Sequence, residues 1–345
     1  MQTKNSDLYK ITLGAESDFL ALKKARIFIT GGTGYIGRWL LDSLCYANTL
    51  LSLDIRLTVL SRSPINFVAS NPELANNKII EFITGDIRTF EFPAGEYTHA
   101  IHAATDVIAE NSPLDTFDVT NNGTRRVLDF CQQRQIENIL LLSSGAVYGP
   151  IPHNISLVPE TYLGCPSPGA LNSAYGIGKI VSEWLGNTYS SQNNLSFKSA
   201  RIFAQVGPHL PLDKQFAAGN FILNTLQKSP ILIKGDGSPL RSYMYSSDLV
   251  VWLLRILSRG ESGKAYNVGS DYAISISDLA KKITQIAGTS NPEIIILGTS
   301  SPDAAPERYV PDISRAQNEL GLSIEVALDE ALYKTIEWYR PRFNR

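Results

Sequence analysis

The sequence is poor in cysteine, in net charge and in long apolar runs. Its 345 residues include only Cys45, Cys131 and Cys165, whose wide spacing and odd number form no zinc pattern and no disulfide framework. The formal net charge of -2 gives no strong basic field, which argues against nucleic acid as a partner. The most apolar stretch, residues 249–257, is interrupted by Arg255 and is far too short to span a bilayer.

Targeting signals and clustered metal ligands are also missing. The first 24 residues mix charged and apolar positions and show no basic start followed by an apolar run and a small-residue cleavage site. This predicts no signal peptide and, with so few cysteines, a cytoplasmic protein that does not bind a membrane. The histidines have no metal-ligand spacing, so no metal site is predicted. They are His99, His102, His153 and His209.

Short apolar segments alternate with helical ones through the first half of the chain. Residues 25–30 form a β-rich run that ends in glycines, and residues 35–44 carry apolar side chains at helical spacing. Strands alternating with helices predict an α/β fold, a doubly wound parallel sheet with helices on both faces. Further predicted strands are residues 57–60, 79–83, 99–102 and 139–142.

A glycine-rich turn follows the first predicted strand and opens the first predicted helix. It reads Gly31-Gly-Thr-Gly-Tyr-Ile-Gly37 and satisfies both GxxGxxG and GxGxxG. Glycine permits the tight turn and lets the backbone approach a pyrophosphate, while the helix N-terminus offers free N–H groups. In this context the turn predicts a dinucleotide site, with a ligand-free turn as the alternative. The predicted contacts are Gly31, Thr33, Gly34, Tyr35, Ile36 and Gly37.

The end of the second predicted strand bears on the choice of dinucleotide. An NAD site usually has an acidic residue there for the ribose 2′-hydroxyl, but this chain has Ser61 and Arg62. An arginine can pair with a 2′-phosphate, which favours NADP over NAD. A solvated loop arginine, or one stacked on adenine in an NAD enzyme, is the alternative.

A tyrosine and a lysine at helical spacing indicate redox chemistry. Tyr175 and Lys179 are four residues apart and face the same side of one helix, while Ser144 ends an apolar strand. Ligands bind at the carboxyl ends of strands in open α/β sheets. A neighbouring ammonium and a positive nicotinamide would stabilise the tyrosinate and lower the pKa of Tyr175. Ser144 would then hydrogen-bond the reacting oxygen while Tyr175 moves its proton, and Tyr175 and Lys179 would also contact the cofactor.

With these features the sequence resembles the extended short-chain dehydrogenases/reductases, and among them the nucleotide-sugar epimerase/dehydratase group. The resemblance covers nearly the whole chain from residue 26 onward. It implies that Asp86 holds the adenine and that Ala103 and Ala104 line the cofactor channel, with Ile87 and Thr105 beside them. The matching motifs are Gly85-Asp86-Ile87, His102-Ala-Ala-Thr105, Gly207-Pro208, Gly235-Asp-Gly-Ser238, Ser247-Asp248 and Tyr266-Asn-Val-Gly269.

The resemblance also implies a substrate and an assembly. The substrate is a nucleoside diphosphate sugar, and Arg241 and Arg308 match arginines that contact its diphosphate or ribose. A surface ion pair is the alternative for Arg241, and Asn220 is a weaker substrate contact. The helical stretches 120–134 and 173–190 match those that pair subunits in the group, which implies a homodimer.

The implied organisation is a Rossmann-type domain with a smaller lobe. Residues 1–24 form an N-terminal extension, and residues 25–205 form the dinucleotide-binding domain, to which residues of about 246–272 return. Residues 206–345 mainly form the C-terminal substrate-binding lobe. The strand–helix alternation weakens after Gly149, where proline and glycine become frequent.

Departures from the group's pattern narrow the expected reaction. Ala204 stands where many relatives have an asparagine, and Gln205 is its possible replacement. Gly145 and Ala146 stand where 4,6-dehydratases have an Asp-Glu pair and where uronate decarboxylases also carry an acid. We therefore expect hydride transfer at hexose C4, by a 4-epimerase or a 4-ketoreductase. The alternatives are a 4,6-dehydratase with its acid elsewhere and a non-catalytic cofactor-binding sensor or scaffold.

Overall fold

A parallel sheet forms the centre of the molecule. The computed structural model describes residues 2–105, 112–214, 216–288, 292–299 and 305–343. Within these residues seven strands form one sheet in the order β11-β6-β5-β4-β1-β2-β3, and each neighbouring pair is parallel. This confirms the predicted sheet. The strands are β1 (Arg26–Thr30), β2 (Arg56–Ser61), β3 (Ile80–Thr84), β4 (His99–His102), β5 (Asn138–Ser144), β6 (Ser196–Ile202) and β11 (Ala265–Val268).

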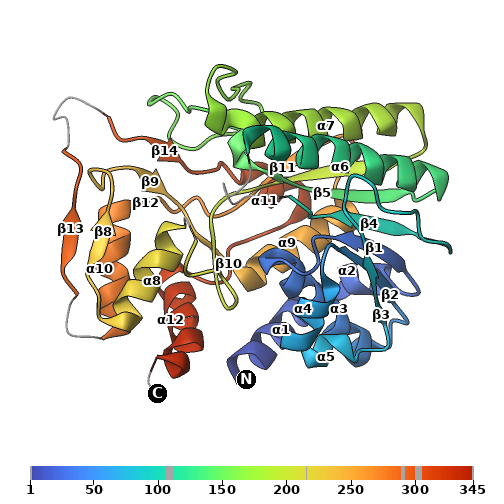
Figure 1. The fold of residues 1–345 in the computed structure, drawn as a ribbon, viewed down its shortest axis with the longest axis horizontal. Coiled ribbons are helices and arrows are strands. Elements are labelled where there is room, and N and C mark those ends of the chain that lie inside the picture. Colours follow the sequence, from blue (N-terminus) through green and yellow to red (C-terminus); the bar gives the residue numbers. More distant parts are fainter. Residues whose placement is uncertain (1, 106–111, 215, 289–291, 300–304, 344–345) are drawn as a thin grey trace.

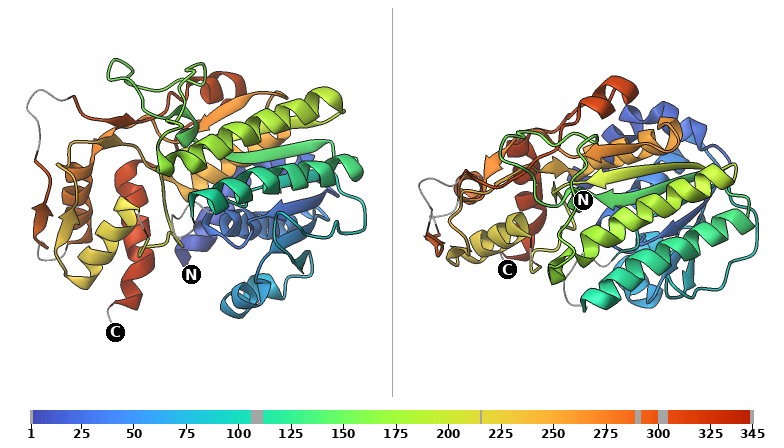
Figure 2. Two further views of the ribbon diagram at one scale, coloured as in Figure 1. Left: turned by 45° about the horizontal axis from the view of Figure 1, so that its top comes forward. Right: turned by 90° about the horizontal axis from the view of Figure 1, so that it is seen from above.

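Helices cover both faces of the sheet, as the doubly wound prediction requires (Figure 1, Figure 2). On one face α3 (Tyr35–Leu51) packs beside α9 (Ser246–Arg259), and on the other α6 (Pro113–Gln133) packs along α7 (Ala174–Gln192). Helix α6 begins with a proline, and Ser112 caps it by accepting a backbone N–H 3.1 Å away. The short helices α4 (Pro64–Ser70) and α5 (Pro72–Ala75) follow β2.

Successive side chains of β1 point to opposite faces of the sheet, and each face has its own apolar core. Ile27 and Ile29 are fully buried on the side of Trp39 in α3. Phe28 points to the opposite face, where its ring centroid lies 4.5 Å from that of Phe130 in α6. Because successive strand residues face opposite sides, one apolar strand can hold helices on both faces.

The N-terminal segment is a packed part of the fold. It forms α1 (Gln2–Gly14) and α2 (Glu16–Ala21), which lie against α3 and α9, and Phe19 is fully buried. Asp18 has no exposed surface and accepts a hydrogen bond from Arg255 at 2.8 Å. Asp7 accepts one from Lys334 at 2.7 Å, which joins α1 to the last long helix of the chain.

A separate apolar core holds the C-terminal lobe together. Phe221, Ile231, Leu279 and Leu332 are buried in it, and they come from four different elements. Neither the helices of this lobe nor any other described helix is long and apolar enough to cross a membrane. The elements are β7 (Gln205–Val206), α8 (Ala217–Gln227), β8 (Ile231–Ile233), β9 (Leu240–Arg241), β10 (Met244–Tyr245), β12 (Ile274–Ser275), α10 (Ile276–Ala287), β13 (Ile294–Ile296), β14 (Arg308–Tyr309), α11 (Ser314–Leu320) and α12 (Leu328–Tyr339).

Candidate active site

A cavity lies at the carboxyl ends of β1, β2 and β4. It has a volume of about 340 Å³ and brings together motifs that are far apart in the sequence. Parallel strands place their carboxyl ends at one edge of a sheet, which explains this convergence. The predicted cofactor residues that line it are Gly31, Thr33, Gly34, Ser61, Arg62, Asp86, Ile87, Ala103, Ala104 and Thr105.

The glycine turn is shaped for close backbone contact. Gly31 has a φ of 70°, and a Cβ atom there would lie 2.5 Å from the carbonyl carbon of Ala103. A Cβ atom on Gly37 would lie 2.2 Å from the Gly31 carbonyl oxygen. Gly34 is the N-cap of α3, so the free N–H groups of this helix face the cavity edge. These features fit the pyrophosphate of a dinucleotide.

Two residues of the turn lie away from the cavity lining. The Tyr35 hydroxyl bonds the Ser246 hydroxyl at 2.6 Å, and burial raises the pKa of this tyrosine. Ile36 packs against the core between the sheet and α3. Both side chains therefore hold the turn in place, and only their backbone belongs to the candidate phosphate site.

Asp86, which was expected to hold the adenine, lines the cavity together with Arg62. It is bound by Arg88 Nε at 2.8 Å, and Arg88 also contacts Asp115 at 2.8 Å and Asp118 at 2.9 Å. Hydrogen bonding to Arg88 is the main reason why the pKa of Asp86 falls to about 2, and the charge of Arg62 lowers it further. Asp86 is thus ionised at neutral pH.

The predicted catalytic residues meet at the end of β5. Ser144 ends this strand, and its Oγ accepts the Ala146 N–H at 3.1 Å in a short 3-10 helix, Gly145–Tyr148. Tyr175 stands at the start of α7, where the Ser144 hydroxyl interacts with its phenol. Lys179, one helical turn later, has its Nζ 5.9 Å from the centroid of the Tyr175 ring.

Lys179 links the catalytic residues to the cofactor cavity. Its Nζ donates to Thr105 Oγ1 and to the Leu142 carbonyl oxygen, both at 2.7 Å. Burial lowers the pKa of Lys179 to about 7, against the opposing charge of Glu183. The Lys179 amine therefore loses its proton more easily than a solvated lysine does.

Burial has the largest effect on the pKa of Tyr175. Burial raises this pKa to about 12, and the interaction with Ser144 opposes the rise only in part. A poorly solvated environment disfavours the charged form of both groups, so it raises the pKa of a phenol and lowers that of an amine. Tyr175 is consequently a neutral hydrogen-bond donor at neutral pH.

A second phenol reaches the same serine and was not predicted from the sequence. Tyr309, in β14, also interacts with the Ser144 hydroxyl. A Cβ atom on Gly145 would lie 2.6 Å from the Tyr309 hydroxyl and 2.7 Å from Phe203 Cζ. These two rings, with centroids 4.6 Å apart, thus occupy the space beside Gly145. The only sequence signal was the match at Arg308, next to Tyr309.

The predicted substrate residues have different surroundings. Arg241 lies 5.8 Å from the Tyr309 ring and pairs with Glu307 at 2.8 Å, and β9 and β14 hold Arg241 opposite Tyr309. Arg308 is half-buried in β14. Asn220 donates to the Leu212 carbonyl oxygen at 2.7 Å, so its amide group holds a loop.

Gln205, the possible replacement for the missing asparagine, lies in β7. Its Oε1 is buried and has no hydrogen-bond partner among the described residues. A buried acceptor without a partner is costly, and a bound ligand can satisfy it.

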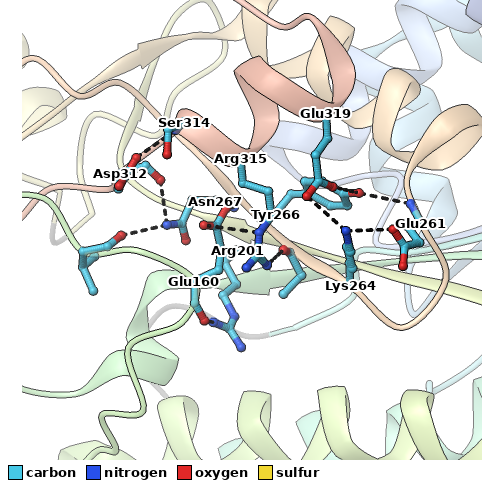
Figure 3. A network of polar contacts seen from close by, with 12 residues as sticks. Glu160, Arg201, Glu261, Lys264, Tyr266, Asn267, Asp312, Ser314, Arg315 and Glu319 are labelled. Atoms are coloured by element: carbon cyan, nitrogen blue, oxygen red, sulfur yellow. Dashed lines mark hydrogen bonds and ion pairs between the residues drawn. The ribbon is translucent and has the colours of Figure 1, made fainter.

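Polar side chains link β5, β6 and β11, and Figure 3 shows those around Asn267 of β11. Ser143 donates to Glu183 at 2.5 Å, and Arg201 binds the same carboxylate at 2.7 Å. Asn267, from the Tyr266–Gly269 motif, lies between Glu160 and Asp312 in Figure 3 and bonds both. This motif therefore has a structural role, joining β11 to the segment that follows β14.

The names of two sequence relatives refer to a nucleotide sugar acid. UDP-glucuronic acid decarboxylase 2 of Arabidopsis thaliana is 29% identical over 336 residues, which cover 96% of this chain and 71% of that protein. UDP-glucuronic acid decarboxylase 1 of Xenopus tropicalis is 31% identical over 326 residues, 93% of this chain and 74% of that protein.

Solved structures share the fold. UDP-glucose 4-epimerase of Thermotoga maritima, solved with UDP-glucose, superposes with a TM-score of 0.78 and 21% identity, over 92% of this chain and 99% of that one. The dTDP-glucose 4,6-dehydratase of Bacillus anthracis, solved with NAD, gives a TM-score of 0.75 and 18% identity, over 93% and 98% of the two chains.

The family model covers most of the chain. The model described as the NAD dependent epimerase/dehydratase family matches residues 27–269. The parallel sheet, the glycine-rich turn and the clustered serine, tyrosine and lysine agree with this match. The chain belongs to the NAD dependent epimerase/dehydratase family.

Proposed function

We propose that this protein transfers hydride at C4 of a nucleotide-linked hexose, as a 4-epimerase or a 4-ketoreductase. The observation that carries the proposal is the meeting of Ser144, Tyr175 and Lys179 beside the glycine-turn cavity. Relatives named for UDP-glucuronic acid support a nucleoside diphosphate sugar as the substrate. In this proposal Arg241 and Arg308 hold its diphosphate or ribose, and Gln205 adds a hydrogen-bond acceptor.

The proposed roles follow from the positions of the three side chains. A bound dinucleotide supplies the hydride acceptor or donor. In the oxidation direction the C4–H bond gives up its hydride, and the proton of the C4 hydroxyl passes to Tyr175, which leaves a C4 ketone. Ser144 would hydrogen-bond the reacting oxygen, and Lys179, which bonds Thr105, would hold the ribose of the cofactor. Returning the hydride to the other face of the ketone gives the C4 epimer.

The surroundings of Gly145 favour this reaction over dehydration. A dehydratase needs an acid for the C6 hydroxyl and a base for the C5 proton. Gly145 has no side chain, and the rings of Phe203 and Tyr309 occupy the space where one would extend. Decarboxylation is the second candidate because the relatives carry that name. It begins with the same C4 oxidation, since a C4 ketone is β to a C6 carboxylate.

Product analysis tests the proposal and separates these reactions. The purified protein is incubated with a panel of nucleotide sugars, including UDP-glucuronic acid, with and without NAD or NADP, and the products are examined by mass spectrometry and NMR. An isomer of unchanged mass identifies an epimerase, and a two-hydrogen gain that requires added NADPH identifies a reductase. Loss of water or of carbon dioxide would overturn the C4-only reaction. No turnover on any sugar would favour a cofactor-binding scaffold.

Arg62 supports NADP as the preferred dinucleotide in this proposal. Replacing Arg62 with alanine should weaken NADP binding about tenfold or more, because a charge-assisted hydrogen bond to a phosphate contributes about 1.5–3 kcal/mol. NAD, which lacks the 2′-phosphate, should bind equally well before and after the change. Fluorescence titration with both dinucleotides measures the difference. Tighter binding of NAD than of NADP to the unaltered protein would contradict the preference.

The faces of α6 and α7 support a homodimer formed by these two helices. Trp184 in α7 is 62% exposed and Leu114 in α6 is 82% exposed. Replacing Trp184 with glutamate should convert the dimer to a monomer, since a large aromatic side chain at an interface contributes strongly to its affinity. Light scattering after gel filtration measures the mass. Leu163→Glu is the matched control, because Leu163 is 94% exposed and lies outside both helices. An unaltered protein that is already monomeric would disprove the assembly.

A further inference from the structure

A chain of hydrogen bonds runs through the interior behind the cofactor cavity, with His102 at its centre. The imidazole Nδ1 lies 2.7 Å from Thr30 Oγ1, and Nε2 lies 3.0 Å from Thr124 Oγ1. Thr30 ends β1, His102 ends β4, and Thr124 lies in α6. All three residues are at most 3% exposed, so each proton needs an acceptor within this chain of contacts.

The Thr120 carbonyl oxygen decides the direction of the bonds at the Thr124 end. It lies 2.6 Å from Thr124 Oγ1, closer than either His102 Nε2 or the Ser182 hydroxyl at 2.9 Å. Because a carbonyl oxygen can only accept, Thr124 gives its single proton to it. Donation to His102 instead would leave two oxygens 2.6 Å apart with no proton between them. Thr124 therefore accepts from His102, and Nε2 carries a proton.

The Ala104 backbone decides the direction at the other end. Its N–H donates to Thr30 Oγ1 at 3.2 Å, which leaves Thr30 with one proton to give. Burial, helped by the charge of Lys179, lowers the pKa of His102 to about 3, so the ring is neutral. A neutral ring with a proton on Nε2 has an acceptor at Nδ1, and Thr30 donates to it. Every donor from Ala104 to Thr124 then has an acceptor.

We propose that His102, as the tautomer protonated on Nε2, is a positioning residue that holds one wall of the cofactor cavity, residues 103–105. The ring fixes the Thr30 hydroxyl, and this hydroxyl fixes the backbone N–H of Ala104. In the proposed function, on which this inference rests, a dinucleotide occupies the cavity. The residues of this group that line it are Thr30, Ala103, Ala104 and Thr105.

Contacts at both ends of the wall make its position important for the site. A Cβ atom on Gly31 would lie only 2.5 Å from the Ala103 carbonyl carbon, so the wall and the glycine turn are in close backbone contact. At the other end, Thr105 Oγ1 accepts the hydrogen bond of Lys179 at 2.7 Å. A shift of the wall therefore changes both the glycine turn and the partner of Lys179, although His102 itself is buried behind the cavity.

Two substitutions that each keep one half of the imidazole test the proposal. His102→Asn places a side-chain oxygen where Nδ1 stands and keeps the acceptor for Thr30, whereas His102→Gln places an amide N–H where Nε2 stands and keeps the donor to Thr124. We expect His102→Gln to raise the Kd of the dinucleotide about tenfold, because the buried Thr30 hydroxyl loses its acceptor and reorients. His102→Asn should keep the Kd within about twofold.

Thermal unfolding distinguishes positioning from general damage. Asparagine leaves the larger cavity, so His102→Asn should lower the melting temperature more than His102→Gln does. The order of the two variants in stability is then the reverse of their order in dinucleotide affinity, which fluorescence titration with NAD and NADP measures. The same order in both measurements would overturn the inference. His99→Gln is the control, because His99 lies in the same strand and its Nδ1 contacts Thr98 Oγ1 at 2.8 Å. It should leave the Kd unchanged.

Nitrogen NMR of the unaltered protein, isotopically labelled at histidine alone, tests the tautomer directly. The signals that disappear in both His102 variants belong to His102, and we expect a protonated Nε2 and an unprotonated Nδ1. A proton on Nδ1 would refute the inference, as would an unchanged Kd in His102→Gln, and both results would leave the proposed function standing. An unaltered protein that binds neither NAD nor NADP would overturn the proposed function as well.

Discussion

Replacing Tyr175 with phenylalanine should lower turnover by about 10²–10⁴-fold and leave dinucleotide binding unchanged, because general acid–base catalysis contributes a factor of this size. The phenol stands at the end of β5, where the Ser144 hydroxyl interacts with it, and it does not line the glycine-turn cavity. Steady-state kinetics with the substrate identified by product analysis measures the loss, and fluorescence titration measures binding. Tyr189→Phe is the matched control, since it lies in the same helix and its hydroxyl bonds Asp129.

The pH dependence of the same reaction gives a second check on Tyr175. Oxidation needs Tyr175 to accept a proton, so the rate should rise with pH as its phenolate forms. Burial raises the pKa of Tyr175 to about 12 and lowers the pKa of Lys179, so the charged form of neither group is favoured by their surroundings. A cationic nicotinamide ring would lower the pKa of Tyr175 and move the rise in rate to lower pH. A rate that is independent of pH from 6 to 10 would contradict Tyr175 as the proton acceptor.

Local patterns in the sequence were sufficient to predict the centre of the fold and most of the candidate site. The alternation of short apolar strands with helices predicts the parallel sheet, and the glycine spacing predicts the turn after β1. The spacing of Tyr175 and Lys179 places them on one side of α7, and Ser144 follows from its place at the end of an apolar strand. Each signal lies within a few residues and depends on backbone geometry alone.

Contacts between distant segments account for what the sequence did not predict. Tyr309 reaches Ser144 only because β14 pairs with β9, and two-residue strands leave no periodic pattern. In the N-terminal segment Asp18 looked like part of a polar extension, yet it is fully buried because Arg255 of α9 neutralises it. A charged side chain in a sequence indicates a solvent-exposed position unless an oppositely charged partner is known. Local sequence cannot identify a partner that lies more than two hundred residues away, as Arg255 does from Asp18.

Replacing Gly37 with alanine should destabilise the protein strongly, and much more than the same change at Gly34. The new Cβ would lie 2.2 Å from the Gly31 carbonyl oxygen and 2.5 Å from Gly32 Cα, and both are backbone atoms that no rotamer change can move. Helix α3 would have to shift away from the turn. Overpacking of this kind costs about 1–3 kcal/mol or more in the free energy of unfolding, and the shift would also separate the helix N-terminus from the phosphate site.

Gly34→Ala is the matched comparison because it adds the same methyl group to the same turn. Its nearest contact would be the Gly31 carbonyl oxygen at 3.4 Å, and its φ of -80° suits an L-residue, so the free energy of unfolding should hardly change. Gly34 nevertheless lines the cofactor cavity, and a methyl group there should weaken dinucleotide binding by blocking close backbone approach. Urea unfolding and dinucleotide titration of both variants separate the two effects. We expect Gly37→Ala to lose both stability and dinucleotide binding, and Gly34→Ala to lose binding alone. Equal stability of the two variants would contradict this expectation.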